Sequence, residues 1–133
     1  MTWTIWEFLD GRGLGILEIW LLKKKIQKKA RATLNQRIDW LRRFGPEAPN
    51  LLAGPIYKHI YKLRVKAQGI QLRPMLCKGP IDNEREFTLL LGAIEKGNKL
   101  QPRDAPERAE VNREEILRDP LRRHVHERFS EQN

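Results

Sequence analysis

Ile56-Tyr-Lys-His-Ile-Tyr-Lys-Leu-Arg-Val-Lys66 is the stretch that decides the expected fold. Read with the two-residue period of a β-strand, it has two unlike faces. One face carries His59, Tyr61, Leu63 and Val65, and the other carries Ile60 with four cations, Lys58, Lys62, Arg64 and Lys66. The pattern predicts a strand whose mainly apolar face covers a core. Its basic face is then either solvated or in contact with a polyanion.

The composition of the whole chain favours a charged partner. The 133 residues are enough for one domain with a single core, and 40% of them are hydrophobic. The net charge of +9 is unevenly distributed, because residues 1–81 contain 16 Lys/Arg and 5 Asp/Glu, whereas residues 82–133 contain 10 and 12. This basic front indicates nucleic acid or an acidic protein as partner. A membrane surface fits less well, because the basic positions do not lie on one long amphipathic helix.

The cysteine content and the apolar runs exclude several classes of protein. Cys77 is the only cysteine, so neither a disulfide framework nor a CxxC metal pair can form, and we expect a small buried thiol. The apolar run from Leu14 to Leu22 is interrupted by Glu18 and is too short to span a bilayer. The acidic residues before it are untypical of a signal peptide. We therefore expect a cytoplasmic protein that does not bind membranes.

The residues before the basic stretch predict a strand and two helices. Residues 2–8 alternate aromatic or β-branched side chains with polar ones, which is typical of a strand. Apolar residues at helical spacing follow, from Leu14 to Leu21 and from Ile26 to Leu41. Gly45-Pro46 is expected to end the second helix, with Gly45 as a left-handed cap. Residues 46–55 contain three prolines and predict a loop.

The residues after the basic stretch predict two more strands and a helix. Residues 70–77 return as the hairpin partner of the basic strand, with an edge or a bulge at Pro74. Residues 86–94 are the most apolar segment, so we expect them at the centre of the sheet. Asp104 is expected to cap a last helix that has Pro106 in its first turn.

Together these elements predict an α+β fold. A small antiparallel sheet, made of the N-terminal strand and a three-stranded meander, packs against a helical hairpin and is followed by a C-terminal helix. We expect one domain over residues 1–118 and a polar, loosely packed tail over residues 119–133. His124 and His126 lie in this tail and do not indicate a metal site, because no further ligands accompany them.

The order of the elements and several short motifs resemble the RelE/HigB superfamily of type II toxin–antitoxin toxins, in particular its phage-derived, HigB-like branch. That family has a helix ending in Leu-x-x-x-Gly, then Gly-Leu-Tyr-Glu-Leu-Arg, a strand centred on an arginine, and Leu-Leu-His-Gly-Phe-x-Lys-Lys. The similar segments here are Leu41-Arg-Arg-Phe-Gly45, Ile60-Tyr-Lys-Leu-Arg64, Leu72-Arg73 and, in part, Leu89-Leu-Leu-Gly-Ala-Ile-Glu-Lys96. The resemblance extends from Trp3 to Leu117.

The resemblance implies a toxin that cleaves messenger RNA, usually inside the ribosome, until a cognate antitoxin binds it. No metal or other cofactor takes part in this activity. The antitoxin is expected to be a helix-turn-helix protein, through which the complex binds operator DNA. In the reaction the RNA 2′-hydroxyl attacks the adjacent phosphate, so the protein must neutralise developing charge and move two protons.

By this resemblance, Arg64 and Arg73 occupy the phosphate-binding, catalytic positions. A planar guanidinium suits this task because it binds phosphate oxygens in pairs. The two strands would be neighbours in a hairpin, which can place both guanidinium groups near one phosphate. The candidates for contacts with the flanking RNA backbone are Lys58, Lys62, Lys66 and Lys96.

The chain departs from the family pattern at residues that matter for proton transfer. It has His59 for a glycine, Leu91 for the histidine, Ala93 for the phenylalanine and Glu95 for the first lysine of the pair. Candidates to replace the lost proton-transfer group are His59, Tyr61 and Lys58. His59 and Tyr61, however, alternate onto the face opposite Arg64, so a hydrogen-bonded core role fits His59 better.

Three functions therefore remain compatible with the sequence. The first is a toxin that acts as a metal-independent endoribonuclease. The second is a binding module for RNA, DNA or protein that has lost its proton-transfer groups, which salt-sensitive binding without cleavage would reveal. The third is inhibition of DNA gyrase, as in ParE-like members of the superfamily, which a supercoiling assay would reveal.

Overall fold

The computed structural model describes residues 2–132 and confirms the predicted α+β class. These residues form the helices α1 (Ile16–Lys23), α2 (Lys28–Phe44) and α3 (Ala105–Arg118) and the short 3-10 turns η1 (Gly45–Glu47) and η2 (Pro120–Arg122). None of the helices within residues 2–132 has the length and hydrophobicity needed to cross a membrane.

The strands form two connected sheets. They are β1 (Thr4–Phe8), β2 (Leu52–Tyr57), β3 (Ile60–Leu63), β4 (Val65–Ala67), β5 (Ile70–Leu72), β6 (Met75–Lys78), β7 (Glu86–Leu91), β8 (Ile94–Lys96), β9 (Lys99–Gln101) and β10 (Arg123–Val125). One sheet has six strands in the order β10-β1-β7-β6-β3-β2, and the other has four in the order β4-β5-β8-β9.

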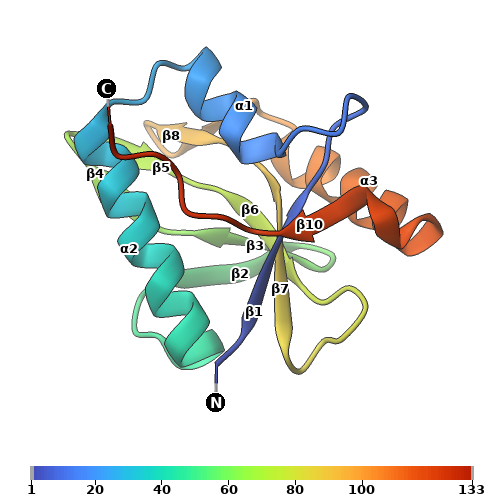
Figure 1. The fold of residues 1–133 in the computed structure, drawn as a ribbon. Helices are drawn as coiled ribbons and strands as arrows, with labels where there is room; N and C mark the ends of the chain where they lie inside the picture. Colours follow the sequence, from blue (N-terminus) through green and yellow to red (C-terminus); the bar gives the residue numbers. More distant parts are fainter. Residues whose placement is uncertain (1, 133) are drawn as a thin grey trace.

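The larger sheet lies between two layers of helix (Figure 1). One core forms between the sheet and the pair α1 and α2, and a second core forms against α3. The apolar strand β7 is central, as predicted, because Leu89 belongs to the first core and Leu90 to the second. β1 runs parallel to β7, so the larger sheet is mixed, and the connection between these two strands contains α1, α2 and the strands β2 to β6.

Both predicted helix caps lie where the sequence places them. Gly45 follows α2 with a φ of +60°, a conformation that favours glycine. Asp104 precedes α3, but its carboxylate makes no hydrogen bond to the helix backbone. It accepts instead from Arg108 Nε at 2.9 Å. α3 begins at Ala105 and has Pro106 in its first turn, as predicted, but it lacks the expected side-chain cap.

Three neighbouring strands are interrupted at the same level, where the two sheets join. The breaks lie at Arg64 between β3 and β4, at Arg73-Pro74 between β5 and β6, and at Gly92-Ala93 between β7 and β8. Leu63 N donates to Pro74 O and Arg73 N donates to Ala93 O, each at 2.8 Å. Pro74 has no N–H to continue the ladder, so the irregularity predicted at this residue is confirmed. We call this junction the strand break.

The basic stretch is not the single strand that its alternation predicted. β2 already begins at Leu52, inside the expected loop, and the chain reverses at Lys58-His59 before β3. Lys58 has a φ of +48° in this turn. The turn lacks the Gly, Asn or Asp that usually marks a two-residue hairpin loop. The alternation of side chains therefore continues through the turn, and the sequence does not reveal it. Beyond the turn the alternation holds, because Leu63 and Ile60 enter opposite cores.

The C-terminal tail is packed, contrary to expectation. β10 pairs with β1, and the segment beyond it runs beside α2 (Figure 1). Phe129 is buried in the core, and its backbone N–H and C=O form hydrogen bonds of 3.0 and 2.9 Å with the Asn35 side chain of α2. The buried residues of this tail are too widely spaced to give a periodic signal in the sequence.

His126 is likewise buried rather than part of a polar tail. Its Nδ1 lies 2.8 Å from Oε1 of Glu7 on β1. The other carboxylate oxygen of Glu7 accepts the backbone N–H groups of Leu17 and Glu18 at the start of α1, at 3.0 and 3.3 Å. The carboxylate of Glu7 thus joins the C-terminal segment, β1 and α1. These hydrogen bonds compensate for the cost of burying a carboxylate.

Gly92 is the residue of the strand break most sensitive to substitution, because a Cβ there would overlap the ring of Trp20 on α1. We expect Gly92→Ala to lower the free energy of unfolding by about 1–3 kcal/mol, measured by urea denaturation, since the indole must shift. Gly11→Ala is the control, because a Cβ at Gly11 meets nothing within 4 Å. Equal stability of the two variants would contradict this packing.

Candidate nucleic-acid interface

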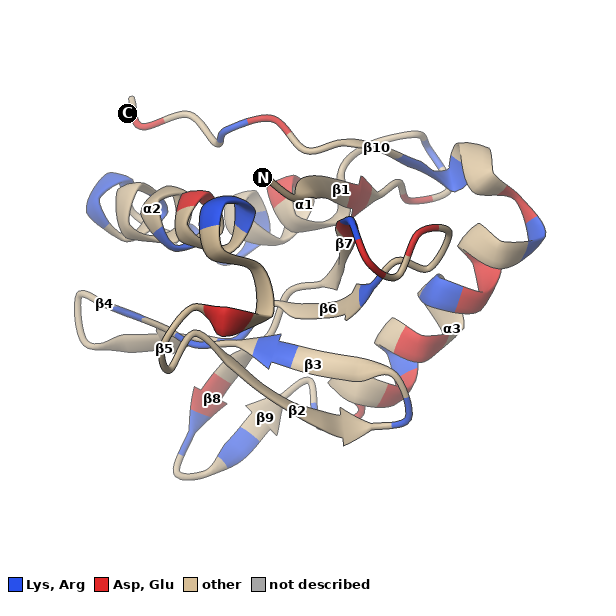
Figure 2. Ribbon diagram, turned by 90° about the horizontal axis from the view of Figure 1, so that it is seen from below, with Lys and Arg blue, Asp and Glu red and all other residues tan. Residues whose placement is uncertain are grey.

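A hollow of about 250 Å³ lies where α2 faces the strand break. We call it the cationic hollow, and its lining residues are Arg37, Trp40, Pro49, Asn50, Leu51, Arg64, Lys66 and Arg73. Four of them are cations and one is a tryptophan, and no carboxylate occurs among the described residues of the lining. In Figure 2, Lys and Arg predominate on α2, which also carries Asp39, whereas α3 carries both signs of charge in similar measure.

α2 contributes the aromatic wall of the cationic hollow. Arg37 and Trp40 are three residues apart and so lie on one face of the helix. The Arg37 guanidinium lies over the Trp40 ring, 4.3 Å from its centroid. Leu34, Ile38 and Leu41 turn into the core on the opposite side, which leaves Trp40 39% exposed. An indole that is this accessible beside cations can stack with a flat ligand.

Arg64 is the exposed cation of the strand break. Its backbone N–H donates to Leu51 O at 2.8 Å, which fixes the segment after η1 against the strands. Its side chain is exposed and has no hydrogen bond or ion pair with any residue among 2–132. All five N–H donors of its guanidinium are therefore available to a ligand.

Arg73 is held in place, in contrast to Arg64. Its side chain is 11% exposed. Its two terminal nitrogens donate to Leu72 O at 3.0 Å and to Gln71 Oε1 at 2.8 Å. Its Nε lies 3.4 Å from Oε1 of Glu95 on β8. These contacts fix the orientation of one guanidinium before any ligand arrives, which lowers the entropic cost of binding.

Glu95 on β8 is the shared partner of two cations, Lys62 and Arg73. It accepts a hydrogen bond from Lys62 Nζ at 2.8 Å and forms the ion pair with Arg73, while its own side chain is 14% exposed. The Lys62 hydrogen bond and the charges of Lys62 and Arg73 outweigh burial and hold the pKa of Glu95 below its ordinary value. Glu95 is thus a carboxylate at neutral pH, and Lys62 is engaged inside the protein.

The structure brings together some of the residues that the sequence singles out and separates others. Arg64, Lys66 and Arg73 line the cationic hollow. Lys58 lies in the β2–β3 turn with its ammonium 5.4 Å from the centroid of the Tyr57 ring, and Lys96 is exposed at the end of β8. Neither lines the hollow, so any contact they make with RNA lies outside it.

The candidate acid–base residues also lie outside the cationic hollow. His59 is in the turn, with a side chain that is 62% exposed, so its expected core position is wrong. Its Nδ1 lies 2.9 Å from Oε1 of Glu110 on α3. Burial raises the pKa of Glu110, but the partners His59 and Arg113 outweigh this and leave it below its ordinary value. Tyr61 is partly buried against the α2-side core.

Cys77 has the inert role that its position predicts. It is fully buried on β6 in the core beneath α3. Burial raises the pKa of its thiol to about 12. A thiol in this state is neither a nucleophile nor a metal ligand at neutral pH.

The contribution of α2 to the site was not predicted from the sequence. Arg37 is one of several basic residues beside the apolar stripe from Ile26 to Leu41, and such residues most often form a solvated helix face. The available signal was Trp40, a large aromatic residue on the polar side of that stripe. Its meeting with Arg64 and Lys66 depends on how α2 packs, which no local pattern contains.

The lowered pKa of Glu95 gives a pH-dependent prediction. The folded pKa lies below the unfolded one, so the ion pairs stabilise the protein above the ordinary value near 4.5 and lose this effect as the pH falls through the lowered value. We expect Glu95→Gln to lower the free energy of unfolding at neutral pH by about 1 kcal/mol. The difference from wild type should shrink in acid.

Urea denaturation across this pH range checks the prediction. Glu84→Gln is the matched control, because Glu84 is exposed and its carboxylate has no ion pair within residues 2–132. A difference between Glu95→Gln and wild type that stays constant with pH would contradict the assigned ion pairs.

Comparison with known proteins does not identify a family or a function for this chain. No protein-family model matches the chain, and neither the curated proteins nor the solved structures gave a match.

Proposed function

We propose that this chain is a RelE/HigB-like toxin that cleaves messenger RNA on the ribosome, in the cytoplasm, and is neutralised by a cognate antitoxin. The observation that carries the proposal is the composition of the cationic hollow. Arg64, Lys66 and Arg73 meet there beside Trp40, without a lining carboxylate among the described residues. A phosphodiester is the ligand that such a set of cations and one accessible indole suits best.

The proposed reaction is a transesterification within the RNA. The 2′-oxygen forms a bond to phosphorus, the bond from phosphorus to the 5′-oxygen breaks, and a 2′,3′-cyclic phosphate remains. One proton leaves the 2′-hydroxyl for water, and another must reach the departing 5′-oxygen. The negative charge that develops on the phosphate oxygens is where positive side chains lower the barrier.

The lining residues divide this work in the proposal. The fixed guanidinium of Arg73 and the free one of Arg64 neutralise the phosphate oxygens. Trp40 provides a surface for an unpaired base. Lys66 donates the proton to the 5′-oxygen, because arginine retains its proton and the other described lining residues carry none to transfer.

The first test is removal of the two arginines. Induced expression of the wild-type chain should arrest growth, and Arg64→Ala with Arg73→Ala should abolish the arrest and lower the rate of ribosomal cleavage at least about a hundredfold, measured by primer extension. Arg43→Ala is the control, because Arg43 is an exposed cation of α2 outside the hollow. Growth arrest that persists in the double variant would refute the site.

The second test separates charge from proton transfer at Lys66. Lys66→Arg keeps the positive charge but not the transferable proton. We expect its affinity for single-stranded RNA to stay within about twofold of wild type, because phosphate contacts depend on charge. Its cleavage rate should fall at least about a hundredfold. Unchanged cleavage by this variant would exclude Lys66 as the proton donor.

One observation favours a second function, which is RNA binding without cleavage. No histidine, tyrosine or carboxylate occurs among the described residues that line the cationic hollow, so proton transfer there depends on Lys66 alone. A pure binding module would bind single-stranded RNA with an affinity that falls steeply as salt is added. It would leave messenger RNA intact in a purified translation mixture, and cleavage there by the wild-type chain would eliminate this alternative.

A further inference from the structure

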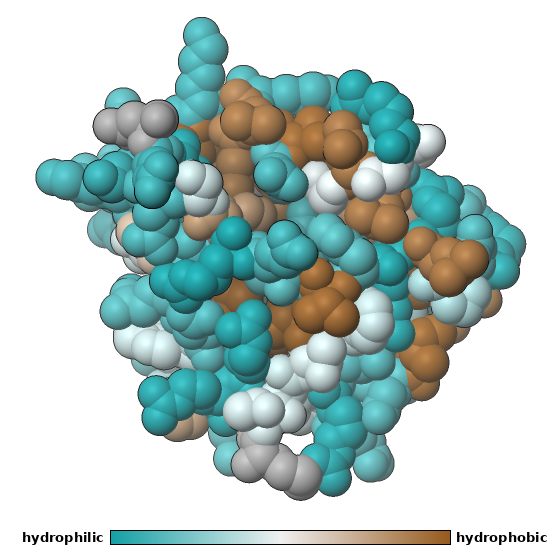
Figure 3. All heavy atoms as spheres, viewed as in Figure 1, coloured by the Kyte–Doolittle hydropathy of each residue, from teal (hydrophilic) through white to brown (hydrophobic). Residues whose placement is uncertain are grey.

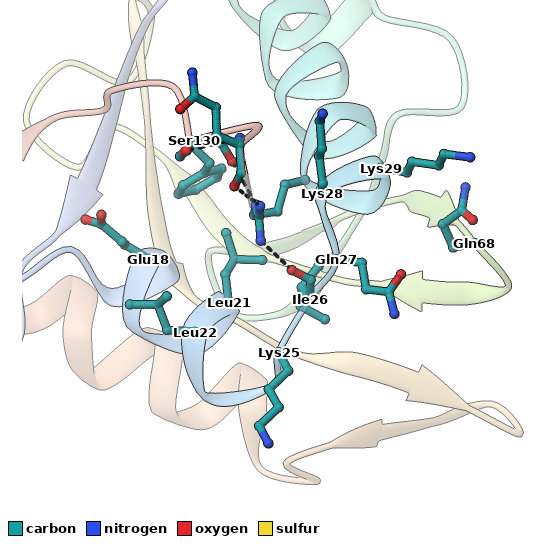
Figure 4. Close-up of a pocket in the computed structure, with 13 residues that line it drawn as sticks. Glu18, Leu21, Leu22, Lys25, Ile26, Gln27, Lys28, Lys29, Gln68 and Ser130 are labelled. Atoms are coloured by element: carbon teal, nitrogen blue, oxygen red, sulfur yellow. Dashed lines mark hydrogen bonds between the residues drawn. The ribbon is translucent and has the colours of Figure 1, made fainter.

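A larger hollow, of about 870 Å³, lies between the end of α1, the connection to α2 and the C-terminal segment (Figure 4). We call it the linker groove. Its apolar residues are Leu21, Leu22, Ile26 and Phe129, and three lysines, Lys25, Lys28 and Lys29, also line it. The linker groove shares no lining residue with the cationic hollow, so it is a separate surface.

Arg31 holds the walls of the linker groove together. Its Nη1 donates to Ile26 O in the connection between the helices, and its Nε and Nη2 donate to Ser130 O and Gln132 O in the C-terminal segment. Each of these distances is 2.7 Å. Because one side chain bonds both walls, the groove exists before a ligand binds (Figure 4).

The groove leaves a large apolar side chain in contact with water. On α1, Leu21 is buried, but Leu22 is 73% exposed. Hydrophobic atoms are visible around α1, between hydrophilic ones, in Figure 3. A single exposed leucine is ordinary on a protein surface, but Leu22 lies at the edge of a hollow whose lining also contains Leu21, Ile26 and Phe129.

The lysines around the groove indicate that a partner bound there is negatively charged. The side chains of Lys25, Lys28 and Lys29 make no hydrogen bond or ion pair within residues 2–132. Glu18 is the only carboxylate among the described residues that line the groove. A ligand that neutralises three lysines and covers Leu22 must combine carboxylates with apolar side chains.

We propose that the linker groove binds an acidic, amphipathic segment of a partner protein. The apolar side chains of that segment cover Leu22, and its carboxylates pair with Lys25, Lys28 and Lys29. RNA fits this surface less well, because Phe129 is only 8% exposed and packs its ring against His126, so no aromatic face is free for a base. A second copy of this chain fits poorly as well, because both copies carry a net charge of +9.

The test uses the full chain and a fluorescently labelled synthetic peptide. The peptide places leucines at helical i, i+3 and i+4 spacing and glutamates elsewhere, so that it forms an acidic amphipathic helix. Fluorescence anisotropy should show binding at least about tenfold tighter than for a scrambled peptide of the same composition, because the scramble has no apolar face. A peptide with lysine in place of every glutamate should not bind.

Two sets of variants locate the binding surface. Leu22→Asp should weaken binding at least about tenfold, and so should Lys25→Glu combined with Lys28→Glu and Lys29→Glu. All four side chains are exposed, so we expect the variants to fold, and circular dichroism melting checks this. Leu121→Asp is the matched control, because Leu121 is 84% exposed and lies outside the groove.

Several results would overturn the proposal. They are equal binding of the designed and scrambled peptides, binding that survives Leu22→Asp, and loss of RNA affinity rather than peptide affinity in the lysine variant. Self-association of the wild-type chain that Leu22→Asp abolishes in analytical ultracentrifugation would show that a second copy occupies the groove. None of these results depends on whether the cationic hollow cleaves RNA, so the two proposals fail or stand separately.

Discussion

The strand break is the constraint on which both the fold and the cationic hollow depend. Pro74 cannot donate to the ladder, and Gly92 leaves room for Trp20 directly above the backbone. At this level the strands leave one sheet and enter the other, so Arg64 and Arg73 emerge where regular pairing stops. A continuous sheet would instead have directed them according to strand alternation, as part of a uniform face.

The two arginines at the strand break differ in their side-chain contacts. Glu95 and two oxygen acceptors hold Arg73, whereas the Arg64 side chain has no such contact within residues 2–132. The same carboxylate engages Lys62 and so removes one cation from the basic stretch. Glu95 therefore takes Lys62 out of the set of free cations and at the same time fixes the orientation of Arg73.

The two hollows are built from different physical chemistry and suit different ligands. The cationic hollow is small, with a charged lining and one accessible indole, which favours a phosphate with an adjoining base. The linker groove is larger, with apolar side chains and separate lysines, which favours a peptide. α2 borders both of them, since Lys28 and Lys29 of its first turn line the groove and Arg37 and Trp40 line the hollow.

The sequence by itself determined the α+β class, the three α-helices of residues 2–132, the central position of β7 and the irregularity at Pro74. The helices and strands follow from the periodicity of hydrophobic residues along the chain. The irregularity at Pro74 follows from its missing backbone N–H group. Both signals are local in the sequence. Only the tertiary structure decided the exposure of His59, the burial of His126 and Phe129, and the meeting of Trp40 with Arg64. Each of these depends on contacts between residues far apart in the chain, such as Asn35 with Phe129, and no local pattern contains such contacts.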